Sequence, residues 1–316
     1  MNKVRIAILG ATSHIAKGLI NNFLKNKTLG LHLYTKSLDK LSVFLESIDV
    51  VERGDCALYA GYGEFMCLSY DVIINCIGIG TVNKPHSNYA DYFTVNEEYD
   101  NLAIRYLREC NPHALYICFS SGAVYGRNFT APVEENSLNC LQVNHVNKND
   151  YYTIMRLNSE AKHRAFKDLR IIDLRVFSYF SRFIDLTDGY FITDIIDCVL
   201  KRKALMVDEQ NIIRDYLHPQ DLFTAVRCAV NTDKVNGAFD INSTKPVTKQ
   251  EVLDYFVAKY DLKYGVKKVF DHHSPTGTKN IYCSNYKNAV AIGYEAQFSS
   301  LDAIKEEAKY IINSKK

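Results

Sequence analysis

Residues 1–16 constrain the fold more than any other stretch of this 316-residue chain. Residues 4–9 are apolar except for Arg5 and predict a short buried strand, which ends at Gly10. Apolar side chains then recur at helical spacing, so we expect a helix that begins near Ser13. A strand, a glycine turn and a helix N-terminus form a phosphate site, because unpaired backbone N–H groups and the helix dipole point at the anion.

This opening predicts nucleotide binding, and a plain strand–helix turn is the alternative. Five residues of the turn are assigned to the cofactor: Gly10, Thr12, Ser13, His14 and Ile15. In NAD-binding folds of this kind, an acidic residue after the second strand bonds the ribose 2′-hydroxyl.

The second predicted strand, residues 31–34, is followed instead by Thr35, Lys36 and Ser37. Two hydroxyls and an ammonium suit a 2′-phosphate, through charge-assisted hydrogen bonds. The sequence therefore favours NADP(H), with NAD(H) as the alternative. The other interpretation of Lys36 is a solvated surface lysine.

Composition excludes several classes of function. The net charge of +2 is too balanced to indicate nucleic acid as the main partner. The longest apolar runs are far shorter than the roughly 20 residues of a membrane span. The nine cysteines form no CxxC pair and no metal cluster is visible, so we expect reduced thiols in a cytoplasmic protein without a bound metal.

The middle of the chain predicts more of the cofactor site. Residues 71–77 are a near-continuous apolar run, typical of a strand that is buried on both faces of a parallel sheet. Open α/β sheets bind ligands at the carboxyl ends of their strands, so Cys76, Ile77 and Gly78 are assigned to the cofactor. Asn96 opens a predicted helix that runs to about residue 110. It is either the cap of that helix or a polar group near the active site.

A tyrosine and a cation form the predicted reactive centre. Tyr152 and Arg156 are four residues apart, so they lie one turn apart on one face of a helix. A fixed positive charge at that distance is expected to lower the phenol pKa from its value near 10 and to suit Tyr152 for acid/base chemistry. Another predicted strand covers residues 114–119, and Ser121 stands at its carboxyl end. Its hydroxyl would share the proton of Tyr152.

The pattern SSxxVYG at residues 120–126, followed by Tyr152 and Arg156 where YxxxK is usual, resembles the extended short-chain dehydrogenase/reductases. These include the nucleotide-sugar epimerases, dehydratases and reductases. The resemblance implies an α/β fold with a Rossmann-type, doubly wound parallel sheet and a smaller C-terminal substrate-binding domain. The dinucleotide-binding domain would comprise residues 1–178, with 214–244 returning to it. Residues 179–213 and 245–316 would form the substrate-binding domain.

The same resemblance implies roles for single residues. Ser121, Tyr152 and Arg156 would be catalytic, and Arg156 would bond the nicotinamide ribose in place of the lysine. Asn96 and Tyr152 would also contact the cofactor.

On the substrate side, Arg214 stands in a segment similar to the family's RDFxxVxD, where an arginine clamps the substrate diphosphate. A structural pair with a neighbouring acid is the alternative for Arg214. Ser178 replaces the family's substrate-holding asparagine. Asp221 would cap the helix at residues 222–230.

These residues predict NADPH-dependent reduction of a keto-sugar nucleotide, a 4-keto-6-deoxy sugar. Tyr152 would give the proton and Ser121 would hold the oxygen. The alternatives are a 4-epimerase with retained NAD and a catalytically silent nucleotide-binding protein. A dehydratase is disfavoured because Gly122 and Ala123 stand where it would carry an acid pair. The helices after residue 96 and around residue 152 could pair across a homodimer.

Overall fold

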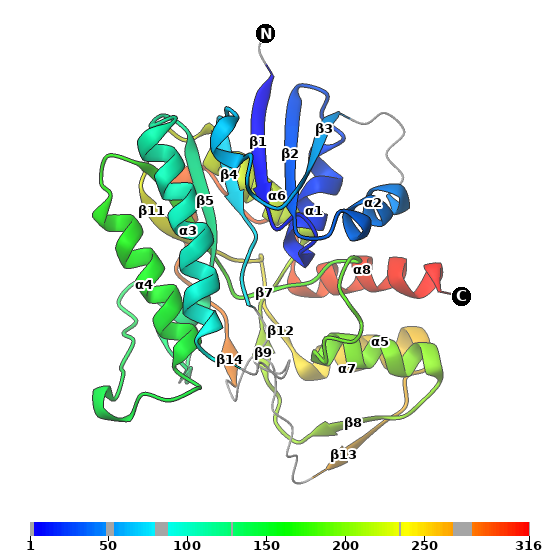
Figure 1. Ribbon diagram of the computed structural model, residues 1–316. Coiled ribbons are helices and arrows are strands. Elements are labelled where there is room, and N and C mark those ends of the chain that lie inside the picture. Colours follow the sequence, from blue (N-terminus) through cyan, green and yellow to red (C-terminus); the bar gives the residue numbers. More distant parts are fainter. Residues whose placement is uncertain are drawn as a thin grey trace.

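The largest part of the fold is a seven-stranded sheet, which lies in the upper part of Figure 1. The computed structural model describes residues 3–48, 54–79, 88–127, 129–233, 235–267 and 280–315. The strand order is β11-β6-β5-β4-β1-β2-β3, and every pairing is parallel. The strands are β1 (Val4–Leu9), β2 (Leu29–Thr35), β3 (Asp55–Ala60), β4 (Val72–Asn75), β5 (Leu115–Ser121), β6 (Arg170–Val176) and β11 (Gly237–Ile241).

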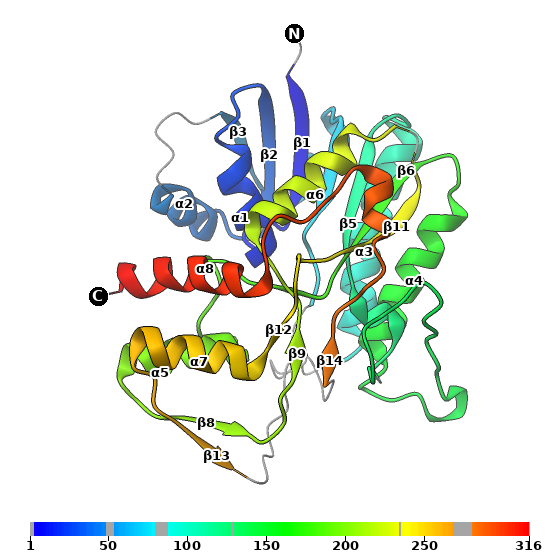
Figure 2. The same ribbon diagram turned by 180° about the vertical axis from the view of Figure 1, so that it is seen from behind.

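Helices cover both faces of this sheet, which confirms the doubly wound α/β fold (Figures 1 and 2). On one face lie α3 (Asp91–Glu109) and α4 (Tyr151–Ala165); on the other lie α1 (His14–Phe23), α2 (Leu38–Ser47) and α6 (Pro219–Asn231). Alternate residues of β1 point to opposite faces: Ile6 and Ile8 join the core under α1 and α6, and Ala7 and Leu9 join the core under α3. A strand buried on both faces needs a continuous apolar run.

The strand order reverses between β1 and β4, and their carboxyl ends point toward a smaller group of elements (Figure 1). This group has its own apolar core. Its helices are α5 (Phe191–Lys201), α7 (Lys249–Tyr260) and α8 (Ser300–Ser314). Its strands are β7 (Ser178–Tyr179), β8 (Leu205–Asp208), β9 (Ile213–Arg214), β10 (Tyr216–Leu217), β12 (Val247–Thr248), β13 (Tyr264–Lys267) and β14 (Ile281–Tyr282). The division into two domains at the boundaries given above stays a prediction.

Short 3-10 helices complete the description: η1 (Phe65–Cys67), η2 (Gly122–Tyr125), η3 (Val143–His145) and η4 (Asn288–Ile292). Within the described ranges, no helix is both long and apolar enough to cross a membrane.

Two predicted helix starts are wrong. The helix α3 begins at Asp91 rather than Asn96, so Asn96 lies inside the helix and cannot be its cap. The helix α6 is capped by His218, whose side chain accepts a hydrogen bond from the backbone N–H of Gln220. The Asp221 carboxylate instead accepts from the backbone N–H groups of Gln297 and Phe298. Sequence spacing cannot show this tertiary contact.

Candidate active site

Gly10 occupies a confined position in the turn after β1. Gly10 has φ +74°, and a Cβ there would lie 2.8 Å from the Ile77 side chain and 3.2 Å from the Cys76 backbone. Only glycine tolerates both the backbone conformation and the close approach of β4. Ser13 caps α1 by accepting from the Ala16 N–H, so the helix N-terminus faces the end of the turn. The turn thus keeps the geometry of a phosphate site although Ser13 and Ala16 replace glycines of the usual fingerprint.

The other residues of the turn have defined partners. Thr12 Oγ1 lies 3.4 Å from Thr35 Oγ1, and Thr35 accepts from the Ser37 N–H. Ile15 is partly buried against the core. His14 Nε2 lies 2.8 Å from Ser181 Oγ, and burial lowers the pKa of His14 to about 3. The neutral His14 ring therefore joins the start of α1 to the segment after β7.

Lys36 is exposed at the end of β2, and its ammonium lies 5.6 Å from the centroid of the Tyr99 ring. The hydrogen bond and charge of Tyr99 raise the pKa of Lys36, and the cation lies beside Tyr99 of α3.

Arg156 connects the predicted acid/base to two other elements. Its Nε donates to the Tyr152 hydroxyl at 3.3 Å, and its Nη1 donates to the Phe119 carbonyl oxygen at 2.9 Å. Nη1 also lies 3.4 Å from Asn96 Oδ1. Burial alone lowers the pKa of this guanidinium, but Tyr152 and Cys118 raise it, and the net change is upward. Arg156 is therefore a buried, fixed cation.

Two neighbours shape the space around this guanidinium. A Cβ on Gly78 would lie 3.0 Å from Arg156 Nη2, so the glycine at the end of β4 leaves room for the arginine. Asn96 donates through Nδ2 to Ser159 Oγ at 2.7 Å and is buried. Asn96 is therefore a buried polar group between Ser159 and Arg156.

The two serines at the end of β5 have different partners. Ser121 Oγ lies 2.8 Å from the Tyr282 hydroxyl and accepts from the Ala123 N–H at 3.2 Å. Ser120 donates to Glu160 at 2.6 Å, and Arg175 forms a bidentate pair with the same carboxylate. Ser120 is therefore structural, whereas Ser121 contacts the Tyr282 hydroxyl.

The ring of Phe177 fills the space beside Gly122. A Cβ on Gly122 would lie 2.3 Å from Cε1 of Phe177. Phe177 also packs 5.1 Å from the Tyr282 ring, so it is held in that position. A side chain at residue 122 would therefore overlap the Phe177 ring.

The predicted substrate residues lie on the short strands beyond the sheet. Arg214 ends β9 and is buried; its Nη1 donates to the carbonyl oxygens of Ile213 and Asn280. Burial lowers the pKa of the Arg214 guanidinium, while Tyr216 and Tyr282 raise it. Ser178 is half-buried on β7, in register with Tyr216 of β10.

Sequence reasoning missed three tyrosines around Tyr152. Tyr92 of α3 packs edge-on against the Tyr152 ring at 5.9 Å. Burial raises the pKa of both Tyr190 and Tyr282, and the charge of Tyr152 adds to each increase. These tyrosines come from α3, the start of α5 and β14, and no motif marks them in a chain with 22 tyrosines.

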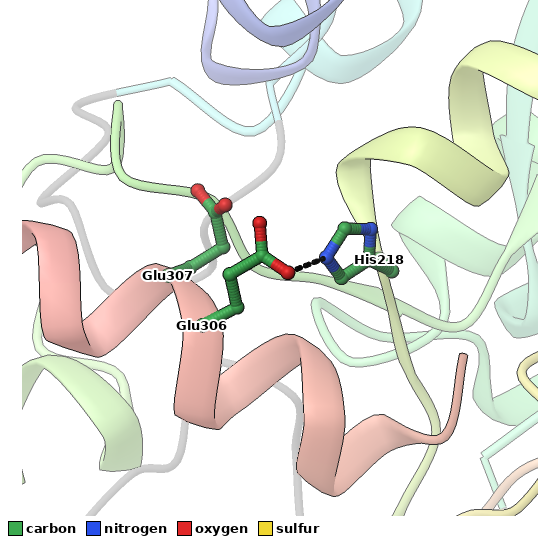
Figure 3. A group of neighbouring side chains, drawn as sticks. All are labelled: His218, Glu306 and Glu307. Carbon is green, nitrogen blue, oxygen red and sulfur yellow. Dashed lines mark hydrogen bonds and ion pairs between the residues drawn. The ribbon is translucent and has the colours of Figure 1, made fainter.

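Among the described residues, one group of side chains has ligand atoms close enough together to hold a metal ion: His218, Glu306 and Glu307 (Figure 3). Glu307 already forms a bidentate pair with Arg182. His218 Nδ1 accepts the Gln220 N–H, so Nε2 carries the ring proton and donates to Glu306 at 3.3 Å. A metal on Nε2 would move the proton to Nδ1 and break the cap of α6. The group instead joins α6 to α8.

The sequence matches a known family over most of this fold. The profile of the "NAD dependent epimerase/dehydratase family" matches residues 6–242. The chain belongs to this family. The resemblance carried by residues 120–126 and 152–156 is thereby confirmed, as is membership of an NAD-dependent enzyme family. No curated protein matches the sequence.

Solved structures show the same fold at low identity. UDP-glucuronic acid 4-epimerase from Bacillus cereus, in complex with a UDP-sugar and NAD, has a TM-score of 0.80 at 16% identity, covering 98% of this chain and 100% of that one. UDP-glucose 4-epimerase from Thermotoga maritima has a TM-score of 0.79 at 15% identity, covering 99% and 100%. dTDP-glucose 4,6-dehydratase from Bacillus anthracis, with NAD, has a TM-score of 0.72 at 15% identity, covering 97% and 96%.

Proposed function

We propose that this protein reduces a keto-sugar nucleotide, a 4-keto-6-deoxy sugar, with NADPH as the reductant. One observation carries the proposal: the Tyr152 hydroxyl receives a hydrogen bond from a buried guanidinium that is itself fixed to β5 and α3. An acid/base group that must move a proton in a defined direction needs such fixed geometry.

The cofactor would lie across the carboxyl ends of β1 and β4, where the sheet order reverses. Gly10, Thr12 and Ser13 would hold its diphosphate, and Cys76, Ile77 and Gly78 would line the nicotinamide half. When bound, the nicotinamide supplies the hydride for the carbonyl carbon. The Nη2 group of Arg156 faces Gly78, and this part of the guanidinium would bond the ribose.

The side chains of this protein supply the proton and the electrostatic support. Tyr152 gives its proton to the carbonyl oxygen, and Ser121 donates a hydrogen bond to the same oxygen as negative charge develops. Arg156 stabilises the resulting phenolate. Arg214 would bond the diphosphate of the sugar nucleotide.

The choice of reduction rests on the end of β2, where Thr35, Lys36 and Ser37 present hydroxyls and an ammonium instead of a carboxylate. A 2′-phosphate there would gain charge-assisted hydrogen bonds. The test is a fluorescence titration of the purified protein with NADPH and with NADH. Before it, the protein is denatured in a separate sample to measure any cofactor that is already bound.

We expect tighter binding of NADPH, and we expect Lys36→Ala to weaken it about tenfold, equal to about 1.4 kcal/mol. NADH affinity should not change. Lys40→Ala is the matched control for removing a lysine, because Lys40 is an exposed residue of α2. Equal affinities in wild type, or no effect of Lys36→Ala, would contradict the NADPH assignment.

The second candidate is a nucleotide-sugar 4-epimerase with retained NAD. It is supported by the similarity of the whole chain to 4-epimerases, one of them in complex with NAD. Tightly held NAD and interconversion of UDP-glucose and UDP-galactose without added reductant would favour it over the reductase.

A further inference from the structure

Tyr282 reaches the active site from a part of the chain that no motif connects with it. Its hydroxyl lies 2.8 Å from Ser121 Oγ, 161 residues earlier in the sequence. Both side chains are buried, with 4% of Tyr282 and 8% of Ser121 exposed. A hydrogen bond in such surroundings is shielded from competing water.

The Tyr282 ring is fixed on its other sides. It packs 5.1 Å from Phe129 in an edge-to-face contact and 5.1 Å from Phe177. On the backbone, Tyr282 of β14 is in register with Arg214 of β9. The same short sheet therefore carries the cation proposed for the diphosphate and the phenol that contacts Ser121.

The direction of the hydrogen bond follows from the acidity of the two hydroxyls. Ser121 Oγ accepts the Ala123 N–H at 3.2 Å. Burial raises the pKa of Tyr282, so the phenol keeps its proton at neutral pH. A phenol is a stronger acid than an aliphatic hydroxyl, so the Tyr282 hydroxyl is the better donor in its bond with Ser121. Ser121 then retains its own proton for a further acceptor.

We propose that Tyr282 is a positioning residue, which donates to Ser121 Oγ and so directs the Ser121 proton toward the substrate oxygen beside Tyr152. This inference rests on the proposed function for the identity of that oxygen. It means that the site is complete only when β14 is in place against the end of β5.

The first experiment needs no substrate. Thermal unfolding midpoints are compared for wild type, Tyr282→Phe, Ser121→Ala and the double variant. Each single change should lower the midpoint by about 2 °C, the size expected for one hydrogen bond. The double variant should lower it by little more than one single change, because both remove the same bond. Additive shifts would overturn the proposal.

The second experiment measures turnover of a dTDP-linked 4-keto-6-deoxy hexose with NADPH. We expect Tyr282→Phe to lower kcat about tenfold with KM changed less than twofold, because the phenol orients a catalytic hydroxyl. Tyr264→Phe on β13 is the control for loss of a tyrosine hydroxyl elsewhere. An unchanged kcat in an active protein would overturn the proposal. Inactive wild type would count against the proposed reaction alone, since the unfolding cycle still decides whether Tyr282 holds Ser121.

Discussion

Arg156 holds the Tyr152 hydroxyl from one turn further along α4, while the other end of its guanidinium is bonded to the Phe119 carbonyl oxygen on β5. A lysine ammonium offers three donors around one point and cannot present them along a planar fork. The close approach of Nη2 to Gly78 shows that the arginine and the glycine fit each other. Arg156 thus bonds three different residues: Tyr152, Asn96 and Phe119.

Replacing Arg156 by lysine should therefore lower activity, although lysine is the usual residue of the family. Lysine keeps the charge but cannot bond Tyr152, Asn96 and the Phe119 carbonyl at once, and we expect kcat to fall about 10- to 100-fold. The measurement is steady-state turnover with the best nucleotide-sugar substrate. Arg156→Met, which removes the charge but keeps an apolar stem, should fall further. A large gain of activity in Arg156→Lys would support a silent protein instead.

Tyr152→Phe should remove the proton donor while leaving the ring packing intact. We expect kcat to fall about 10²- to 10⁴-fold. Tyr151→Phe is the matched control, because the neighbouring Tyr151 ring contacts Tyr89 and Phe93 and not the reactive centre. Comparable losses in both variants would exclude Tyr152 as the specific acid/base.

The parts of the site that are formed by residues close together in the sequence could be predicted. The turn at Gly10 and the cap at Ser13 depend on neighbouring residues, and Tyr152 and Arg156 meet because a helix brings residues four apart together. Tyr282 and Phe177 could not be predicted. Their contacts with Ser121 and Gly122 depend on how β14 and the end of β6 pack against β5, and spacing along the chain does not encode this.

The fold shows the same limit. The buried strand around residues 72–75 was predictable from its apolar run, since its two faces join two different apolar cores. The start of α3 was misplaced because Asn96 resembles a cap, whereas its amide is buried against Ser159 of α4. Likewise Asp221 binds backbone N–H groups at residues 297 and 298, and a contact across 76 residues leaves no local signal.

A buried histidine predicts how stability depends on pH. His163 lies between the carboxylates of Asp100 and Asp173, at 2.7 Å and 2.9 Å, and Lys162 and Arg164 bond the same two carboxylates. Burial alone lowers the pKa of His163, but Asp173 and Asp100 raise it, to about 9. Because the folded pKa lies above the unfolded value of 6.5, this contribution is fully present below pH 6.5. It is lost as pH rises through 9.

Urea unfolding between pH 6 and 10 should show this loss, on the order of 2–3 kcal/mol from His163. NMR titration of the histidine ring protons measures the His163 pKa directly, with His163→Gln to assign the signal. His113→Gln, at an exposed histidine, should leave the stability profile unchanged. A His163 pKa near or below 6.5 would contradict the assignment of a charged histidine to this network.

The contact between Gly122 and Phe177 predicts a destabilised variant and its rescue. A methyl group on Gly122 would overlap the Phe177 ring, whose nearest carbon is 2.3 Å from the Cβ position. Gly122→Ala should therefore lower the free energy of unfolding by about 1–3 kcal/mol, because the ring cannot move without displacing Tyr282. Adding Phe177→Leu should restore part of this loss. Phe177→Leu alone should be destabilising, because it leaves a cavity beside Gly122, so the two changes should be strongly non-additive. Additive losses in chemical denaturation would show that the ring does not confine this position.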